Sequence, residues 1–364
     1  MFALFNLRAS SRVTPLRRLH TATSAPRFSI AFDIDGVLIK GKQVIPQTRR
    51  ALELLQENKI PYIFLTNGGG MRESEKADQL TKKLGVYVNP EHLIVSHSPM
   101  RSLVSKYRDA NVMVVGGKGS ACKHAAHDYG FKNVVTPEEI HSIHPSVCPI
   151  SDCETRAEPW TEKGLENVGK PVDAVMVFHD SNDWGRDLQL CLDALVSKDG
   201  KLGTIKDSDQ LHNTKQTVPI YFSNPDIVWA NEYPVPRFGQ GTFRVCLEKI
   251  YQNLTGQPLE YVTYGKPMKT TYEYADSLLD KIDPLPKLGP DGQPAKRTVY
   301  AVGDNPYADI AGANGHGWNS VLVKTGVFRP KGNENHHLHP ATTVVDHVED
   351  AVRWIIAREN MKNK

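Results

Sequence analysis

The sequence predicts an α/β protein in which a parallel-sheet core is interrupted by a second α/β domain. Short apolar strands alternate with amphipathic helical stretches from Arg27 onward, which is the pattern of a parallel α/β sheet. The same alternation resumes near the C-terminus, and a separate strand and helix block occupies about residues 98–232. We therefore expect a discontinuous core, residues 27–97 and 233–364, with residues 98–232 inserted into it.

Two strand–helix units open the core. The strand FSIAF precedes a helix within IPQTRRALELLQENKI, where Pro46 suits a first helical turn and Leu52 and Leu55 form an apolar stripe. The strand PYIFL precedes the helix MRESEKADQLTKKLG, which Gly85 can end in a left-handed conformation. The order β-α-β-α follows from the start of the core.

The inserted block and the returning core are built from the same elements. The block contains the strands NVMVVGG, DAVMVFHD and VPIYFSNPD and the helix GRDLQLCLDALVSKDG. The core resumes with the strands EYVTYGKP, RTVYAVGDN and SVLVKTGVF and ends in the helix VEDAVRWIIAREN. The GGKGS segment at residues 116–120 lacks the full spacing of a phosphate-binding loop, which favours a turn of the inserted domain.

Composition separates the first 26 residues from the rest of the chain. They contain four arginines, several Ser and Thr and no acid, which is typical of a mitochondrial transit peptide, and a disordered basic tail is the alternative. Without these arginines, 40 basic residues face 41 acidic ones, so the charge gives no indication of nucleic-acid binding. The sequence has no apolar run of about 18 residues, so we expect no membrane span. The five cysteines lack C-x-x-C spacing and are expected to be reduced thiols.

Polar side chains follow several predicted core strands, at the point where each strand ends. Asp33 and Asp35 lie one residue apart after FSIAF, which brings like charges together unless a cation or a substrate lies between them. The carboxyl ends of parallel strands meet in one crevice, so residues far apart in sequence can converge there. The others are Thr66, Asn67, Lys266, Asp304 and Asp309.

These residue types suit phosphoryl transfer. Asp33, Asp304 and Asp309 supply the hard oxygen ligands that Mg²⁺ prefers. With Mg²⁺ and Lys266 offsetting charge, a carboxylate can attack a phosphate dianion and form an aspartyl-phosphate. Thr66, the amides of NGGG and the following helix N-terminus offer donors to the phosphoryl oxygens.

The segments DIDGVL, LTNGGG, YGKP and GDNPYADIAGAN resemble, in this order, motifs one to four of the haloacid dehalogenase superfamily. The resemblance implies that Asp33 is the nucleophile and Asp35 the general acid and base. It implies that phosphate is bound by Thr66, Asn67, Gly68 and Lys266. It also implies that the metal is bound by Asp33, the main-chain carbonyl of Asp35, Asp304 and Asp309.

The insertion between motifs two and three resembles the class IIA branch of this superfamily. That likeness implies a Rossmann-like parallel-sheet core with an inserted α/β C2 cap domain, and it allows a homodimer paired through the cap. The TNGGG and KTGVFRP variants are most similar to the subfamily called haloacid dehalogenase-like hydrolase domain-containing protein 5, or cat eye syndrome critical region protein 5. Gly68 and Ala308 depart from the Asn and the Thr or Ser found in many class IIA phosphatases.

An acidic residue at position 35 favours phosphate-ester hydrolysis, because an alkoxide leaving group needs a proton donor. A large cap over the crevice indicates a small phosphorylated metabolite as substrate. Together with the predicted transit peptide, this favours a mitochondrial, Mg²⁺-dependent phosphatase of small phosphate monoesters. The alternative is a weakly active or non-catalytic relative that binds a phosphorylated ligand or a protein partner. We expect the substrate-facing loop of the cap at His179, Asp180, Asn182, Asp183 and Trp184. The histidines of ENHHLHP, namely His336, His337 and His339, suggest a solvated loop more than a metal site.

Overall fold

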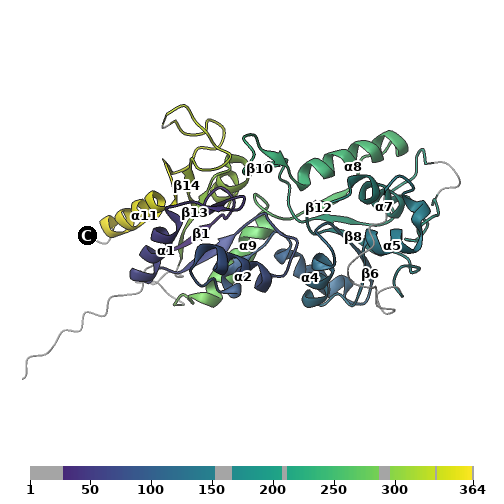
Figure 1. Ribbon diagram of the computed structural model, residues 1–364, viewed down its shortest axis with the longest axis horizontal. Helices are drawn as coiled ribbons and strands as arrows, with labels where there is room; N and C mark the ends of the chain where they lie inside the picture. Colours follow the sequence, from purple (N-terminus) through teal and green to yellow (C-terminus); the bar gives the residue numbers. More distant parts are fainter. Residues whose placement is uncertain (1–27, 152–165, 207–210, 287–295, 333, 363–364) are drawn as a thin grey trace, which may run out of the picture.

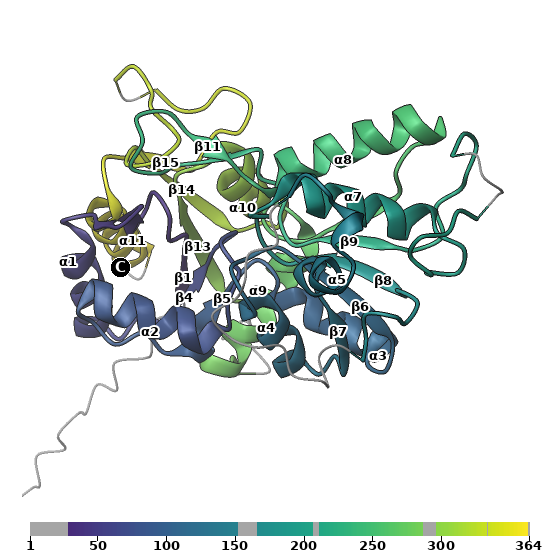
Figure 2. The same ribbon diagram turned by 45° about the vertical axis from the view of Figure 1, so that its right-hand side comes forward.

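The computed structural model describes residues 28–151, 166–206, 211–286, 296–332 and 334–362 (Figure 1). Two lobes lie side by side in both views of the chain (Figures 1 and 2), and each is built on a parallel β-sheet. The early and late parts of the chain form one lobe, and the middle forms the other. This arrangement confirms the predicted α/β fold with an inserted α/β cap.

The core sheet has six parallel strands in the order β15-β14-β13-β1-β4-β5. Their bounds are β1 Phe28–Phe32, β4 Tyr62–Leu65, β5 Leu93–Ile94, β13 Thr298–Gly303, β14 Asn319–Val323 and β15 Thr343–Val345. A short antiparallel hairpin follows β1 and consists of β2 Ile39–Lys40 and β3 Gln43–Val44.

Helices cover both faces of the core sheet. They are α1 Thr48–Glu57, α2 Glu73–Leu84, α9 Lys269–Ile282, α10 Ala311–Gly315 and α11 Val348–Lys362, with short turns η1 Pro90–His92 and η4 Pro306–Ile310. Alternate residues of β1 face opposite ways, so Phe32 packs with α1 and α11 while Ala31 packs with α9. A strand buried on both faces explains why FSIAF is apolar almost throughout. Gly85 ends α2 at φ +67°, as its sequence predicts.

The cap sheet has five parallel strands in the order β12-β9-β8-β6-β7. Its strands are β6 Asn111–Val115, β7 Asn133–Val135, β8 Ala174–Val177, β9 Ile220–Phe222 and β12 Tyr261–Thr263. Its helices are α3 Val104–Tyr107, α4 Ala121–Tyr129, α5 Pro137–Ile143, α7 Trp184–Val196 and α8 Gln240–Thr255, with short turns η2 Ser98–Leu103 and η3 Pro145–Val147. A hairpin of β10 Val228–Trp229 and β11 Arg237–Phe238 lies between β9 and α8.

The structure differs from the expected domain boundary after residue 232. The strand within EYVTYG, which the pattern assigned to the core, is β12 and pairs with β9 of the cap sheet. Phe243 and Leu247 of α8 are buried in the same apolar cluster as the cap strands. Tyr264 also belongs to the cap, because its N–H bonds to Phe222 O at 2.8 Å. We therefore use the name cap for residues 98–264. The sequence could not predict this boundary, because a short apolar strand does not indicate which of two sheets it joins.

No helix in the described part of the chain is both long and apolar enough to cross a membrane. The predicted transit peptide at residues 1–26 lies outside the described residues. Four of the five cysteines fall within them, namely Cys122, Cys148, Cys191 and Cys246, and all four are free thiols, as predicted.

Candidate active site

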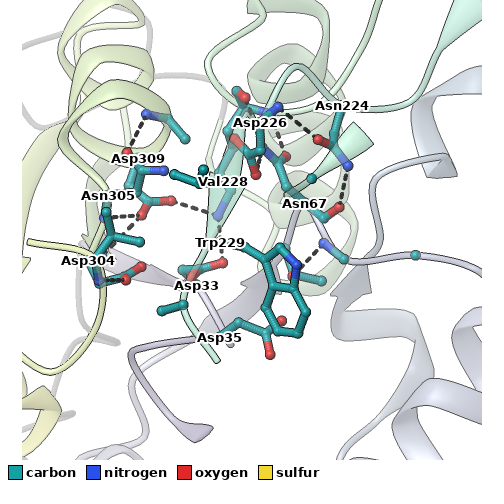
Figure 3. A pocket seen from close by; sticks show the side chains of 18 of the residues that line it. Asp33, Asp35, Asn67, Asn224, Asp226, Val228, Trp229, Asp304, Asn305 and Asp309 are labelled. Carbon is teal, nitrogen blue, oxygen red and sulfur yellow. Dashed lines mark hydrogen bonds and ion pairs between the residues drawn. The ribbon is translucent and has the colours of Figure 1, made fainter. Parts of the chain in front are cut away.

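A cavity of about 280 Å³ lies where the carboxyl ends of the core strands face the cap. All eight predicted site residues line it, and cap residues complete its wall. The predicted residues are Asp33, Asp35, Thr66, Asn67, Gly68, Lys266, Asp304 and Asp309, and the cap residues include His179, Asp180, Asn224, Asp226 and Trp229 (Figure 3).

Asp33 and Asp304 are neighbours because their strands are neighbours. β1 and β13 pair in parallel with Phe32 opposite Val302, and each strand leads directly into an acid-containing turn. Asp309 follows on the η4 turn, and its Oδ2 accepts hydrogen bonds from the backbone N–H groups of Asp304 at 3.1 Å and Asn305 at 2.9 Å. The carboxylate of Asp309 is thereby aimed back at the strand ends.

Asp33, Asp304 and Asp309 form a buried cluster of carboxylates. Their oxygens lie within 4.8 Å of one another, and no other group of three potential metal ligands converges within the described residues. Burial raises the pKa of Asp33 well above its usual value, although Lys266 opposes the shift. Burial and the neighbouring Asp309 raise the pKa of Asp304 to about 7. Like charges this close favour a cation between them, and three hard oxygen donors fit a divalent ion such as Mg²⁺.

Glycines leave room for these carboxylates. A Cβ atom on Gly303 would overlap the Asp309 carboxylate, and one on Gly326 would overlap the Asp304 carboxylate. The backbone of the Gly326 turn also contributes, because Val327 N–H donates to Asp304 Oδ2 at 2.6 Å. Close approach of backbone to carboxylate is therefore part of how the fold orients the acids.

Lys266 joins the acid cluster as its counter-charge. Its Nζ lies 2.6 Å from Asp33 Oδ1 and 2.6 Å from Asp309 Oδ1. Burial alone would lower the pKa of Lys266, but the carboxylates of Asp309 and Asp33 raise it above its usual value. The lysine is thus a fixed cation. Its expected position at the end of a core strand is wrong, because it follows β12 of the cap sheet through a short connection.

The segment after β4 forms the loop that we expected to bind phosphate. Thr66 is buried, and its Oγ1 accepts a hydrogen bond from Gly68 N–H at 2.9 Å. A Cβ atom on Gly68 would lie 3.4 Å from Asp35 Oδ2, so the Asp35 carboxylate faces this loop. The Asp35 carboxylate lies outside the three-acid cluster, and metal binding by its main-chain carbonyl stays a prediction.

Asn67 lines the cavity, and its side chain bonds to protein groups; phosphate binding by this residue stays a prediction. Its Oδ1 accepts from Lys266 N–H at 2.7 Å, and its Nδ2 donates to Lys266 O at 2.9 Å. The same Nδ2 donates to Asp226 Oδ2 at 3.0 Å. Asn67 therefore links the loop after β4 to Lys266 and to the cap.

Only part of the predicted cap loop reaches the cavity. His179 and Asp180 line it. Asn182 instead donates to Gly117 O, Asp183 caps α7 by accepting from Arg186 N–H at 3.0 Å, and Trp184 packs edge-on against Phe243. The GGKGS segment lies beside this loop, since Gly117 N–H also donates to Asp180 O, and it forms the turn that we predicted before α4.

The histidines at residues 336–339 lie on the surface and stack with one another. The rings of His336 and His339 are parallel at 5.8 Å, and both contact Tyr307 edge-on. They are not part of the converging ligand group found within the described residues.

Sequence reasoning missed three cap residues at the site, namely Asn224, Asp226 and Trp229. The first two belong to the SNPD segment, whose position directly after a strand resembles that of the core motifs. That signal could have marked them. Trp229 lies in a two-residue strand that the sequence pattern does not reveal.

Two family models match the two ends of the chain. Residues 30–132 match a model described as haloacid dehalogenase-like hydrolase, and residues 263–351 match one described as HAD-hydrolase-like. These segments carry all four motifs.

Two curated relatives match almost the whole chain. A Saccharomyces cerevisiae protein named mitochondrial hydrolase is 40% identical over 346 residues, covering 91% of this chain and 96% of that protein. A Schizosaccharomyces pombe cardiolipin synthase (CMP-forming) and mitochondrial hydrolase fusion protein is 38% identical over 349 residues. That match covers 93% of this chain but only 55% of the fusion protein.

Solved structures share the fold. A hypothetical protein from Pyrococcus horikoshii aligns with a TM-score of 0.61 and 22% identity, covering 90% of this chain and 99% of that one. A 4-nitrophenylphosphatase from Thermotoga maritima aligns with a TM-score of 0.58 and 16% identity, covering 90% and 98%. Together with the motifs and the full-length yeast relative, these matches establish that the chain belongs to the haloacid dehalogenase superfamily of hydrolases, with the two-sheet architecture of its class IIA members.

Proposed function

We propose that the protein is a mitochondrial, Mg²⁺-dependent phosphatase of small phosphate monoesters that works through a phosphorylated Asp33. The observation that carries this proposal is the position of Asp33 at the end of β1, 2.6 Å from Lys266 and within a buried three-acid cluster. A nucleophile, a fixed cation and a divalent-metal ligand set are thus gathered at one edge of the sheet.

Asp33 attacks phosphorus and displaces the alcohol. Lys266 binds Asp33 Oδ1, so we assign Oδ2 as the attacking atom. Lys266 offsets the negative charge of the phosphoryl oxygens, and Thr66 orients these oxygens. Bound Mg²⁺, held by Asp33, Asp304, Asp309 and the Asp35 carbonyl, would supply further neutralisation of the phosphate charge.

Asp35 acts as the general acid and base. Its carboxylate faces the Gly68 loop at the cavity wall, where the leaving oxygen of an ester bound at Asp33 would lie. It protonates the leaving alkoxide, and its conjugate base then removes a proton from the water that hydrolyses the acyl-phosphate. The same carboxyl group serves both half-reactions.

The cavity supports a small substrate. About 280 Å³ beneath the cap accommodates a metabolite and excludes a folded protein. Met71, Val228 and Trp229 give one part of the wall an apolar surface, while His179 and Asp180 offer polar contacts. The structural likeness to a protein named 4-nitrophenylphosphatase supports phosphate esters as the substrate class.

The arginine-rich, acid-free segment at residues 1–26 and the yeast relative named mitochondrial hydrolase support a mitochondrial, and we propose matrix, location. A chain beginning at Arg27 should keep its activity but remain cytosolic on cell fractionation. We further propose that the chain is of the haloacid dehalogenase-like hydrolase domain-containing protein 5 type, on the TNGGG and KTGVFRP variants.

Phosphate release from a panel of phosphorylated metabolites and 4-nitrophenyl phosphate tests the proposal. We expect release with Mg²⁺ and none with EDTA, and Asp304→Asn should weaken the apparent affinity for Mg²⁺. If the wild type releases no phosphate from any ester, yet binds phosphorylated ligands, the protein is a binding relative and the phosphatase proposal is wrong.

A further inference from the structure

We propose that Asn67 and Asp226 are positioning residues, which hold the main chain of Lys266 and make the placement of this lysine depend on the cap. The inference rests on the proposed function for its kinetic test, but a binding measurement given below tests it separately.

Lys266 needs such support because the core sheet does not supply it. Asp33 and Asp304 follow paired core strands directly, whereas Lys266 follows β12 of the cap sheet. Its Nζ must nevertheless lie between two core carboxylates, 2.6 Å from each. A contact that fixes its backbone relative to the core is therefore required for this geometry.

Asn67 provides that contact through both polar atoms of its side chain. Oδ1 accepts from Lys266 N–H at 2.7 Å, and Nδ2 donates to Lys266 O at 2.9 Å, across 199 residues of sequence. The amide thus pairs with the lysine backbone as a neighbouring strand would.

The cap holds Asn67 in turn. The second hydrogen of Nδ2 is directed to Asp226 Oδ2 at 3.0 Å, and Asn224 Nδ2 donates to Asn67 O at 3.0 Å (Figure 3). Asn224 and Asp226 are themselves joined, since Asp226 N–H donates to Asn224 Oδ1 at 2.9 Å. The segment after β9 therefore contacts Asn67 at both its side chain and its main chain.

These contacts argue against direct phosphate binding by the Asn67 side chain. An asparagine amide has two N–H donors, and here one bonds to Lys266 O and the other to Asp226. A phosphate would have to break one of them. The role that fits all three bonds is alignment of Lys266, and a misplacement of about 1 Å in such a group can cost about 10²-fold in rate.

An exchange of the two side chains tests the proposal. Asn67→Asp places two carboxylates opposite each other and sets an acceptor against Lys266 O, so kcat for 4-nitrophenyl phosphate with Mg²⁺ should fall about 10²-fold. Asp226→Asn keeps an oxygen acceptor and should cost less than about tenfold. In the double variant, the amide introduced at position 226 can donate to the carboxylate at position 67, and kcat should recover at least about tenfold relative to Asn67→Asp.

The control is Asn111→Asp, the same substitution at a buried cap amide that lies away from the cavity. Asn111 Nδ2 donates to the backbone oxygens of Asn167, Lys170 and Pro171 at 3.1–3.3 Å. This variant should lower the unfolding temperature without lowering kcat. If Asn67→Asp does not fold, Asn67→Ser removes the clamp without adding charge; it should show the same loss of kcat, and Asp226→Asn should not restore it.

Calorimetric titration with inorganic phosphate and Mg²⁺ gives the readout that is independent of turnover. Phosphate affinity should fall in Asn67→Asp and recover in the double variant, because Lys266 returns to its place. Loss without recovery, in kcat or in affinity, would mean that Asn67 binds phosphate itself and would overturn the proposal. An equal loss of kcat in Asn111→Asp would also overturn it. A wild type inactive on every ester would defeat the proposed function and leave the titration to decide this inference.

Discussion

At the scale of single residues, Asp33 and Asp35 are two carboxylates on one strand end with different surroundings. Asp33 is buried and bonded to Lys266, whereas Asp35 is half-buried and faces the Gly68 loop. In the proposed mechanism, the first environment holds the nucleophile, and the second leaves a carboxyl group accessible to the leaving oxygen and to water. The strand ends at Phe32, so Asp33 and Asp35 do not share one face as residues two apart in a strand would; they lie in the turn that Gly36 completes at φ +92°.

This division predicts different defects for the two amide variants. Asp33→Asn removes the nucleophile and a metal ligand, so turnover should fall to background and no acyl-phosphate should form. Asp35→Asn should cost about 10²–10⁴ in rate, as expected for a lost acid–base group. With an aryl phosphate, whose leaving group needs little protonation, phospho-Asp33 should accumulate in Asp35→Asn and appear in the intact mass. Metal-dependent activity in Asp33→Asn would contradict the mechanism.

His97 is a residue whose burial predicts pH-dependent stability. Its ring stacks on Phe178 at 4.8 Å, and its Nδ1 lies 2.7 Å from the Tyr129 hydroxyl. Burial lowers the pKa of His97 to about 4, so the folded protein prefers the neutral ring. The unfolded chain takes up this proton near its usual pKa of about 6.5, and the contribution present above that pH is lost as the pH falls toward 4.

We therefore expect the free energy of unfolding to fall by up to about 1.4 kcal/mol per pH unit in this window because of His97. His97→Phe keeps a flat ring on Phe178 and should show a shallower slope between pH 6.5 and 4 in urea titrations. His337→Gln, at an exposed histidine, is the matched control and should keep the wild-type slope. Parallel curves for wild type and His97→Phe would show that the ring is not neutral by burial.

At the scale of elements, the β10–β11 hairpin places one aromatic ring in the cavity and one outside it. Trp229 and Asp35 both line the cavity (Figure 3), and we expect the indole ring to contact the leaving group. Phe238, on the paired strand, is 69% exposed. Trp229→Ala should raise KM for 4-nitrophenyl phosphate about tenfold, through lost stacking, with little change in kcat. Glycerol phosphate should be affected less, and Phe238→Ala should leave both constants unchanged; equal effects on the two substrates would refute the contact.

The sequence predicted most strands of the core sheet but assigned one strand to the wrong sheet. FSIAF, PYIFL and RTVYAVGDN are buried, run into polar turns and were predicted as the strands that present Asp33, Thr66 and Asp304. YVTYG carries the same pattern in only three strand residues, and nothing in it distinguishes the two sheets. Lys266 lies beside Asp33 and Asp309, but the prediction that brought it there assigned its strand to the core sheet, which the structure contradicts. The backbone of Lys266 also pairs with Asn67, 199 residues away in the sequence, and only the folded chain reveals such a pairing.

At the scale of the whole molecule, the site is assembled from both lobes. The core supplies the acids and the loop that we propose binds phosphate, and the cap closes the cavity with Asp180, Asn224, Asp226 and Trp229. Both lobes use one design, a parallel sheet covered by helices on each face, with apolar clusters of their own. Because no apolar cluster mixes residues of the two lobes, the cap is expected to be an exchangeable unit, provided that its true ends are used.

A chimera experiment can distinguish the two possible ends of the cap, residue 264 from the strand pairing and residue 232 from the sequence pattern. A chimera in which residues 98–264 are replaced by the complete cap of another class IIA phosphatase keeps β12 with β9 and α8 over its own sheet. It should fold, retain Mg²⁺ dependence and change the order of preferred substrates.

Exchanging only residues 98–232 leaves the resident α8 and β12 to cover a foreign sheet, where Phe243 and Leu247 lose the cluster that buries them. Misfitting two large apolar side chains costs several kcal/mol, a large share of the about 5–15 kcal/mol that stabilises a domain, so this chimera should be insoluble or unfold early in a thermal melt. Equal stability of the two chimeras would place the boundary back at residue 232, and an unchanged substrate order in a folded 98–264 chimera would remove the cap from substrate selection.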